Sequence, residues 1–223
     1  MLAKVFHLLA SVLSISCANY HKAVDVPQDI TQDEGHCLWK DNNDITFINT
    51  LTSSGLFDST APRVFKNLVN YGGDMWFYMK PYPSNGKSGS QQMENVYQGL
   101  KSAQIKFSHI TVHIGDPQLW SSGSDANTIS KDLIQRADQH GISVQFFTSQ
   151  SNWHSITNNN RSFSSYKLWW AHTNGAGNGG ATSPNFEGFV SFGGWTSSSL
   201  VGKEYARQVQ ECGVTVNKYV YVK

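Results

Sequence analysis

Short apolar runs alternate with segments of helical spacing along the first part of the chain. Five runs have the length and the Val, Ile and aromatic content of buried strands, and they cover residues 23–26, 45–51, 74–79, 109–114 and 143–148. Between the runs, apolar residues recur three and four positions apart, as at Met93, Val96, Tyr97, Leu100 and Ala103 and at Ile129, Leu133, Ile134 and Ala137. Strands that alternate with helices are typical of βα units around a parallel sheet.

The pattern changes after about residue 160. Three further runs are predicted to be strands, at residues 167–172, 189–192 and 214–222, and a loop rich in Gly, Asn and Ser covers residues 173–184. Little between these strands has helical spacing. The chain is therefore predicted to be an α/β protein, a single TIM-like barrel of about five βα units followed by three strands with few helices. Eight strands in one chain of 223 residues suit a closed barrel better than an open sheet.

The N-terminal residues have the order of a secretory signal peptide. Lys4 precedes an apolar run over residues 5–15, and small residues at 16–18 form a cleavage site before Asn19. We therefore predict a signal peptide at 1–18 and one barrel domain at 19–223, with a buried N-terminal helix as the alternative. No later segment reaches the roughly 18 apolar residues of a membrane span. The protein is expected to be secreted, or delivered to a lysosome-like lumen, without a membrane partner.

Charge and composition narrow the class of partner. The chain has a formal net charge of +1 and 13% aromatic residues, which is typical of a folded protein and not of a disordered one. Nucleic acid is disfavoured as the main partner, because its binding needs clustered excess Lys and Arg. His109, His113 and His140 lie on different predicted elements without ligand spacing, so no metal site and no cofactor are expected.

Two cysteines remain after Cys17 leaves with the signal peptide. Cys37 and Cys212 are an even number in an oxidising compartment, which favours a disulfide, while their spacing leaves two free thiols open as the alternative. A bridge between them would close a long loop, worth on the order of 4–5 kcal/mol in the chain-entropy model. Asn160-Arg161-Ser162 is a glycosylation sequon, so Asn160 is a predicted modification site.

Six segments carry, in chain order, a resemblance to a known family. They include Leu168-Trp169-Trp170-Ala171-His172 and Phe192-Gly193-Gly194-Trp195, and the others lie at residues 23–26, 35–38, 78–81 and 116–120. On these segments the sequence resembles the lysozymes of glycoside hydrolase family 25, most closely those of nematodes and protists. The resemblance implies an eight-stranded barrel with a peptidoglycan-binding groove at the C-terminal ends of its strands. It also implies cleavage between N-acetylmuramic acid and N-acetylglucosamine.

The chemistry of that family centres on an Asp-Ile-Glu triplet at the end of the fourth strand, and here the triplet is His113-Ile114-Gly115. Side chains two apart on a strand share one face. Glycoside cleavage needs two carboxyl groups on that face, one to protonate the leaving oxygen and one to stabilise the transition state. A further family Asp near the last strand is replaced by Thr215. Only Asp25 remains in place, so the catalytic motif is predicted to be degenerate.

Three hypotheses for the function follow from the resemblance. The first is a secreted, monomeric pseudoenzyme of innate defence that binds bacterial cell-wall glycan without cutting it. The alternative is an active muramidase in which a bulge at Gly115 turns Asp116 inward to act with Asp25. The third is an inert scaffold for a protein partner. The residues predicted to bind glycan, with packing of the barrel rim as the alternative for some of the Trp rings, are Tyr78, Trp120, Trp170, His172, Trp195 and Asn217.

Overall fold

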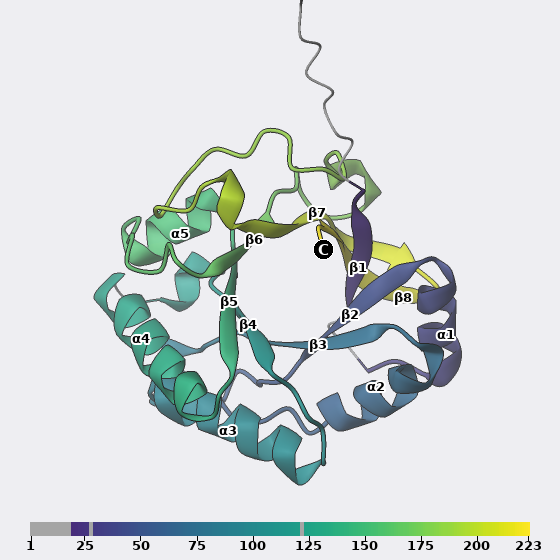
Figure 1. Cartoon of the computed structure of the whole chain (residues 1–223), viewed down its shortest axis with the longest axis horizontal. Helices are drawn as coiled ribbons and strands as arrows, with labels where there is room; N and C mark the ends of the chain where they lie inside the picture. Colours follow the sequence, from purple (N-terminus) through teal and green to yellow (C-terminus); the bar gives the residue numbers. More distant parts are fainter. Residues whose placement is uncertain (1–18, 27–28, 121–122) are drawn as a thin grey trace, which may run out of the picture.

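Eight strands close into a barrel in chain order (Figure 1). The computed structural model describes residues 19–26, 29–120 and 123–223, so the predicted signal peptide lies outside the described residues. The first seven strands are parallel, and β8 is antiparallel to both β7 and β1, between which it closes the barrel. The strands are β1 (His21–Val26), β2 (Asn43–Asn49), β3 (Asp74–Met79), β4 (His109–His113), β5 (Ser143–Thr148), β6 (Lys167–Ala171), β7 (Leu200–Glu211) and β8 (Val214–Tyr221).

An α-helix follows each of the first five strands and lies outside the barrel (Figure 1). Two of these helices begin with a capping box, one at Thr31 and one at Ser88. In a capping box, the side chains of a Ser or Thr and of the residue three positions on each accept a hydrogen bond from the other residue's backbone N–H. In the described part of the chain, the connection from β6 to β7 contains only short 3-10 turns. The prediction of five βα units followed by three strands with few helices is confirmed. The helices are α1 (Gln32–Lys40), α2 (Ala61–Leu68), α3 (Gly89–Ser102), α4 (Gly123–Gln139) and α5 (Gln150–Thr157).

The position of the seventh strand was predicted wrongly. The sequence favoured residues 189–192, but β7 is Leu200–Glu211, and Phe192 forms only an isolated bridge with Trp195. Phe192 is buried and Phe189 is partly buried in the apolar layer outside the barrel, whereas Val190 is exposed. The true strand escaped detection because it carries Lys203, Glu204 and Arg207, and charged residues do not indicate a buried strand.

The inside of the barrel is filled with aromatic side chains. Phe47 lies at its centre, with its ring centroid 4.9 Å from Trp169 and 5.3 Å from Tyr219. Gly202 allows the Trp169 ring to lie against β7, because a Cβ at that position would come within 2.2 Å of the indole. A second apolar layer packs between the strands and the helices. Since the interior is packed and not a pore, a ligand has room only at the ends of the barrel.

The predicted disulfide between Cys37 and Cys212 is confirmed. It joins α1 to the turn between β7 and β8, with 5.7 Å between the two Cα atoms. The bridge therefore ties the last hairpin of the barrel to its first helix.

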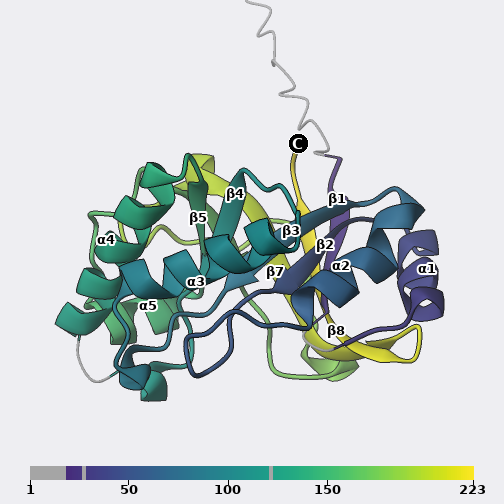
Figure 2. The same cartoon turned by 90° about the horizontal axis from the view of Figure 1, so that it is seen from below.

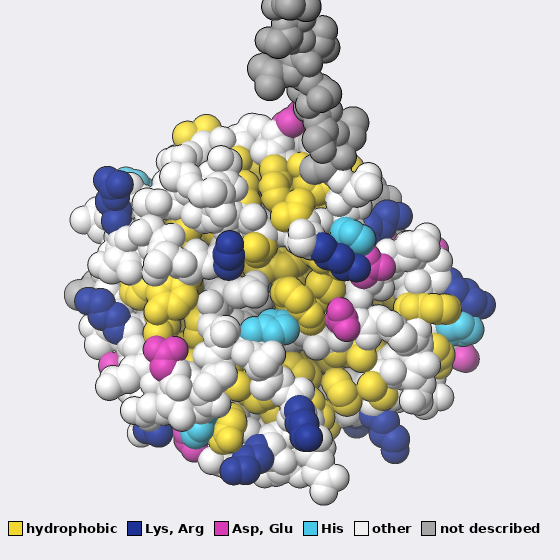
Figure 3. Space-filling view, in the orientation of Figure 1, with side chains coloured by type: hydrophobic (Ala, Val, Ile, Leu, Met, Phe, Trp, Pro, Cys, Tyr) yellow, Lys and Arg dark blue, Asp and Glu magenta, His cyan; other side chains and the backbone are white. Residues whose placement is uncertain are grey.

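Both ends of the described chain lie at the end of the barrel where β1 begins (Figure 2). Figure 3 looks onto this same end, where Lys, Arg, Asp and Glu side chains are scattered around a more hydrophobic centre. Neither sign of charge gathers into a patch on this face. Within the described residues, no helix combines the length and apolar character that a membrane crossing requires. The functional site is found at the opposite end of the barrel, where the parallel strands finish.

Candidate functional site

A hollow of about 310 Å³, here called the central cavity, opens where the parallel strands end. Its walls come from the last residues of the strands and from the connections that follow them. The polar and charged side chains in its lining are Asp25, Lys80, His113, Asp116, Asn152, Glu204, Arg207, Gln208, Asn217 and Tyr219.

Two further hollows adjoin the central cavity. The first side cavity, of about 400 Å³, lies beside Trp170 and shares Asn152 and Arg207 with the central cavity. The second side cavity, of about 550 Å³, lies beside Trp120 and shares Leu119. Because neighbouring hollows share lining residues, the three lie side by side at the mouth of the barrel, and together they are here called the groove.

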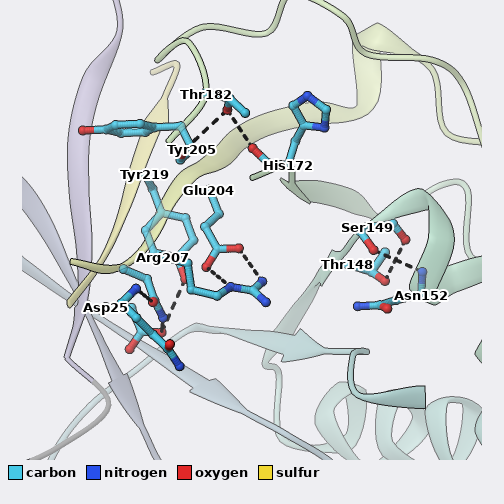
Figure 4. A network of polar contacts seen from close by, with 12 residues as sticks. Asp25, Thr148, Ser149, Asn152, His172, Thr182, Glu204, Tyr205, Arg207 and Tyr219 are labelled. Carbon is cyan, nitrogen blue, oxygen red and sulfur yellow. Dashed lines mark hydrogen bonds and ion pairs between the residues drawn. The ribbon is translucent and has the colours of Figure 1, made fainter. Parts of the chain in front are cut away.

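Asp25, at the floor of the central cavity, is 2% exposed. Its Oδ2 accepts a hydrogen bond from Asn217 Nδ2 at 3.1 Å. The same oxygen accepts one from Tyr219 OH at 3.4 Å (Figure 4). Its Oδ1 is buried and has no hydrogen-bond partner in the described part of the chain. Burial raises the pKa of Asp25 to about 6, although the Asn217 hydrogen bond and the Lys80 charge oppose the change. This carboxyl group is therefore readily protonated in mildly acidic solution.

His113, at the first degenerate position, is held between aromatic rings. Its ring centroid is 4.2 Å from that of Tyr78 and 4.3 Å from that of Phe147, and 7% of the residue is exposed. Burial lowers the pKa of His113 well below its usual range, and the positive charges of Lys80 and Arg207 lower it further. The imidazole is thus neutral and packed, so it is not in the protonated form that a general acid needs at neutral pH.

Gly115, at the second degenerate position, lies just past the end of β4 and has space around it. A Cβ added to Gly115 would meet only Asn152 Nδ2, at an ordinary contact distance of 3.6 Å. The next residue, Asp116, has a positive φ of 54°, and its exposed side chain contributes to the lining. Asp116 and Asp25 therefore line the same cavity, which is the arrangement that the active-muramidase hypothesis requires.

Glu204 and Arg207, both on β7, are central-cavity residues that the sequence did not indicate. Arg207 donates from Nε to Glu204 Oε1 at 3.1 Å and from Nη2 to Oε2 at 2.6 Å (Figure 4). Burial raises the pKa of Glu204 and Arg207 opposes that change, while the pKa of Arg207 is raised by its bond to Glu204. Residues three apart point to opposite faces of a regular strand. Here the register shifts between residues 204 and 209 bring both side chains to the cavity.

The last strand presents one of its two predicted site residues. Asn217 lines the central cavity and donates to Asp25, while its Oδ1 accepts the backbone N–H of Gln208 at 2.9 Å. Thr215 lies further out on the β7–β8 hairpin, where its hydroxyl accepts from Gln210 Nε2. It is not part of the lining. The expectation that Thr215 marks an acid position of the cavity is therefore wrong.

Trp170 and His172 line the first side cavity, as predicted for groove residues. The Trp170 ring is 4% exposed and stacks on the His172 ring, with the centroids 4.4 Å apart. Lys203 Nζ lies 5.0 Å from the centroid of the Trp170 ring and donates to the backbone oxygen of Ser183. His172 is therefore the exposed member of this stack, and Trp170 supports it from below.

The other three predicted aromatic positions differ in their exposure. Trp120 lines the second side cavity, where its Nε1 donates to the Gly115 carbonyl at 3.1 Å. Tyr78 is 1% exposed and stacks beneath His113, outside the lining of the groove. Trp195 is fully buried, and its ring centroid lies 4.6 Å from that of Trp153. The expectation that the Tyr78 and Trp195 rings meet a sugar is therefore wrong, because neither ring has exposed surface to offer.

The predicted glycosylation site, Asn160, is not part of the groove lining. Asn160 follows α5, and its side-chain oxygen accepts the backbone N–H of Ser162 at 2.7 Å. Among the described residues, no group of three or more His, Cys, Asp or Glu side chains is arranged to hold a metal ion.

An eight-stranded barrel with carboxyl groups in a groove at the strand ends has the architecture of a β/α-barrel glycoside hydrolase. Comparison with known proteins narrows this class. A family model described as Lysozyme-like protein 1 matches residues 16–205. Lysozyme-like protein 1 of Caenorhabditis elegans is 32% identical over 209 residues, which are 92% of this chain and 70% of that protein. The chain therefore belongs to the lysozyme-like protein family.

Two further similarities connect the chain to glycoside hydrolase family 25. Probable GH family 25 lysozyme 2 of Dictyostelium discoideum is 27% identical over 215 residues, covering 96% of this chain and 94% of that protein. The structure of a family GH25 lysozyme from Aspergillus fumigatus matches with a TM-score of 0.70 at 14% identity, over 92% of this chain and 95% of that chain. The latter shows a common fold. The predicted resemblance to this family and the predicted barrel are both confirmed.

Proposed function

We propose that this protein is a secreted lysozyme-like protein of innate defence that binds bacterial cell-wall glycan and does not cleave it. The observation that carries the proposal is the end of β4, where the two carboxylates expected from the family resemblance are replaced by His113 and Gly115. His113 is buried and neutral, and Gly115 has no side chain to donate a proton. Loss of a general acid alone typically lowers a rate by about 10²–10⁴.

The carboxylates that remain are poorly placed to replace the lost pair. Glu204 is 1% exposed, and both its oxygens are occupied by Arg207. Asp25 is 2% exposed and is held by Asn217 and Tyr219. A general acid must come within hydrogen-bond reach of the oxygen that it protonates, and these two groups line the central cavity with almost no exposed surface of their own.

Glycan binding does not depend on the lost acids. The groove has an exposed His172 over Trp170 and polar side chains such as Asn152 along its lining. Aromatic faces and fixed hydrogen-bond donors bind sugars without titrating. We expect weak binding of peptidoglycan fragments, with a dissociation constant on the order of 10 µM to 1 mM.

Secretion is part of the proposal and rests on the order of charged, apolar and small residues at positions 1–18. The Cys37–Cys212 disulfide supports it, because such bridges persist in oxidising compartments.

An active muramidase is the second candidate, and one observation favours it. Asp116 and Asp25 line the same cavity, and a carboxyl group with a pKa of about 6, as Asp25 has, suits a general acid. In this candidate Asp25 would protonate the glycosidic oxygen and Asp116 would stabilise the positive charge that develops on the sugar.

Clearing of bacterial cell walls, measured beside a peptidoglycan pull-down, separates the candidates. Our proposal expects pull-down without clearing between pH 4.5 and 7.5, and no change in clearing for Asp25→Asn or Asp116→Asn. Clearing by the wild type that is lost in Asp116→Asn would establish the second candidate instead. If the protein neither binds peptidoglycan in the pull-down nor clears cell walls, the protein-partner hypothesis remains.

A gain-of-function variant tests whether the missing acids account for the proposed lack of cleavage. Gly115→Glu combined with His113→Asp restores the acids at the end of β4, and the open space at Gly115 accepts a side chain. We expect clearing at least about 10² above the wild-type background, which is the lower range for a general acid. The matched control Gly115→Gln with His113→Asn has nearly the same shape without the acids and is expected to stay inactive.

A further inference from the structure

The charged side chains of the central cavity differ in their exposure to solvent. The Arg207 side chain is 40% exposed, whereas the Glu204 side chain beneath it is 1% exposed. Lys80 is partly exposed, and among the described residues it has no ion-pair partner within 4.0 Å. Of the acids, Asp25 is buried and Asp116 is exposed. Two cations and one anion therefore face a ligand in this cavity.

Glu204 fixes the orientation of the Arg207 guanidinium. The carboxylate occupies Nε and Nη2, one edge of the planar group. Nη1 makes no hydrogen bond to any described residue, so the outer edge is left for a ligand. A guanidinium edge with two parallel N–H groups matches the two oxygens of a carboxylate. Arg207 also lines both the central and the first side cavity, so this edge lies along the path of the groove.

We propose that Arg207, positioned by Glu204, together with Lys80 binds a carboxylate of the glycan, so that the groove selects acidic saccharides over neutral ones. The inference rests on the proposed glycan-binding function and names the chemical class of its ligand. In peptidoglycan the carboxylate comes from the lactyl group of muramic acid or from the attached peptide. Chitin oligomers have the same acetamido sugars without the acid and are the neutral comparison.

Titration calorimetry of the full mature protein with three ligands tests the selectivity. The ligands are N-acetylglucosaminyl-N-acetylmuramic acid with a free lactyl carboxylate, the same disaccharide with its peptide attached, and N,N′-diacetylchitobiose. We expect at least one acidic ligand to bind about tenfold more tightly than diacetylchitobiose, which corresponds to about 1.4 kcal/mol. Preference for the free lactyl disaccharide identifies the lactyl carboxylate. Tighter binding of the peptide form identifies the peptide carboxylates, and equal binding of the two means that the site accepts either carboxylate.

Variants assign the selectivity to the named residues. Glu204→Gln with Arg207→Gln removes both charges together and leaves two amides that can hydrogen-bond, so no buried charge is left unpaired. We expect acidic ligands to bind it about tenfold more weakly, with diacetylchitobiose unchanged. Lys80→Gln, on a different element, is expected to weaken the acidic ligands alone by about threefold, and it provides the test if the double variant does not fold. Lys66→Gln removes an exposed cation on α2, away from the groove, and serves as the matched control.

The outcomes separate this inference from the function on which it rests. Equal affinity of the wild type for all three ligands overturns the inference and leaves the glycan-binding function standing. Absence of binding to any of them overturns both. Acidic preference that survives in the double variant and in Lys80→Gln also overturns the inference, since other residues would then be responsible.

Discussion

Replacement of Asp25 by Asn should change how the stability of the protein depends on pH. Asp25 is buried in the floor of the central cavity, and burial raises its pKa from 3.8 to about 6. Between these two values the folded protein keeps a proton on Asp25 that the unfolded chain has lost. The stability that this proton confers is fully present below pH 3.8 and is lost as the pH rises through about 6.

The size of the effect follows from the same two pKa values. One pKa unit is worth about 1.36 kcal/mol, so the wild type loses about 3 kcal/mol over the whole transition. The amide of the Asp25→Asn variant does not titrate, and it has nearly the same shape as the neutral acid. We therefore expect the free energy of unfolding of Asp25→Asn, minus that of the wild type, to rise by about 2–3 kcal/mol between pH 4 and pH 7.5.

Urea denaturation of both proteins at a series of pH values measures this difference. Urea is uncharged, so it leaves the electrostatic interactions of the cavity unscreened. Subtraction cancels the titration of other groups and any constant difference in hydrogen bonding between Asn and Asp. Asp116→Asn, at an exposed acid of the same cavity, controls for the loss of one negative charge and should stay within about 0.5 kcal/mol of the wild type. A difference for Asp25→Asn that is flat from pH 4 to 7.5 would refute the argument, because the carboxyl group would then be as well solvated as in the unfolded chain.

Three further predictions concern the disulfide, the groove and the N-terminus. Cys37→Ala with Cys212→Ala should lower the free energy of unfolding by about 4–5 kcal/mol, since the bridge spans 175 residues, and a loss under about 1 kcal/mol in urea melts would contradict the chain-entropy account. Trp170→Ala should weaken muropeptide binding by about 1 kcal/mol, because His172 loses the ring on which it stacks. An unchanged affinity in titration calorimetry would show that Trp170 and His172 do not contribute to the binding site. Intact-mass spectrometry of secreted protein should give a chain that starts at Asn19, and retention of residues 1–18 would disprove the cleavage site.

The fold was predictable where hydrophobic pattern and burial agree. The strands over residues 74–79 and 143–148 have the predicted bounds, because their apolar residues face either the barrel interior or the helices. The run at 189–192 looked equally apolar, but it packs on the outside of the barrel as part of a connection. The hydrophobic pattern alone does not distinguish an apolar strand from an apolar connecting segment of similar length.

The missed strand and the missed site residues have one cause. Glu204 and Arg207 are buried or half-buried charges whose burial is compensated by their mutual ion pair, and a single sequence gives no sign of such pairing. Their common face depends on register shifts in β7, which the alternation of residue types does not reveal. Trp195 was misplaced for a related reason. Gly193 and Gly194 both have positive φ angles and turn the chain back so that the indole packs on Trp153.

The remaining acids of the cavity are arranged to position other side chains. Asp25 accepts from Asn217 and Tyr219, and Glu204 accepts both donors of one Arg207 edge. A buried carboxyl group with a raised pKa weakens the fold at neutral pH, so packing alone gives no reason to keep Asp25. Its hydrogen bonds supply a reason, because Asn217 and Tyr219 line the groove and lose their orientation without it. This arrangement supports the proposal that the cavity holds a glycan by fixed donors.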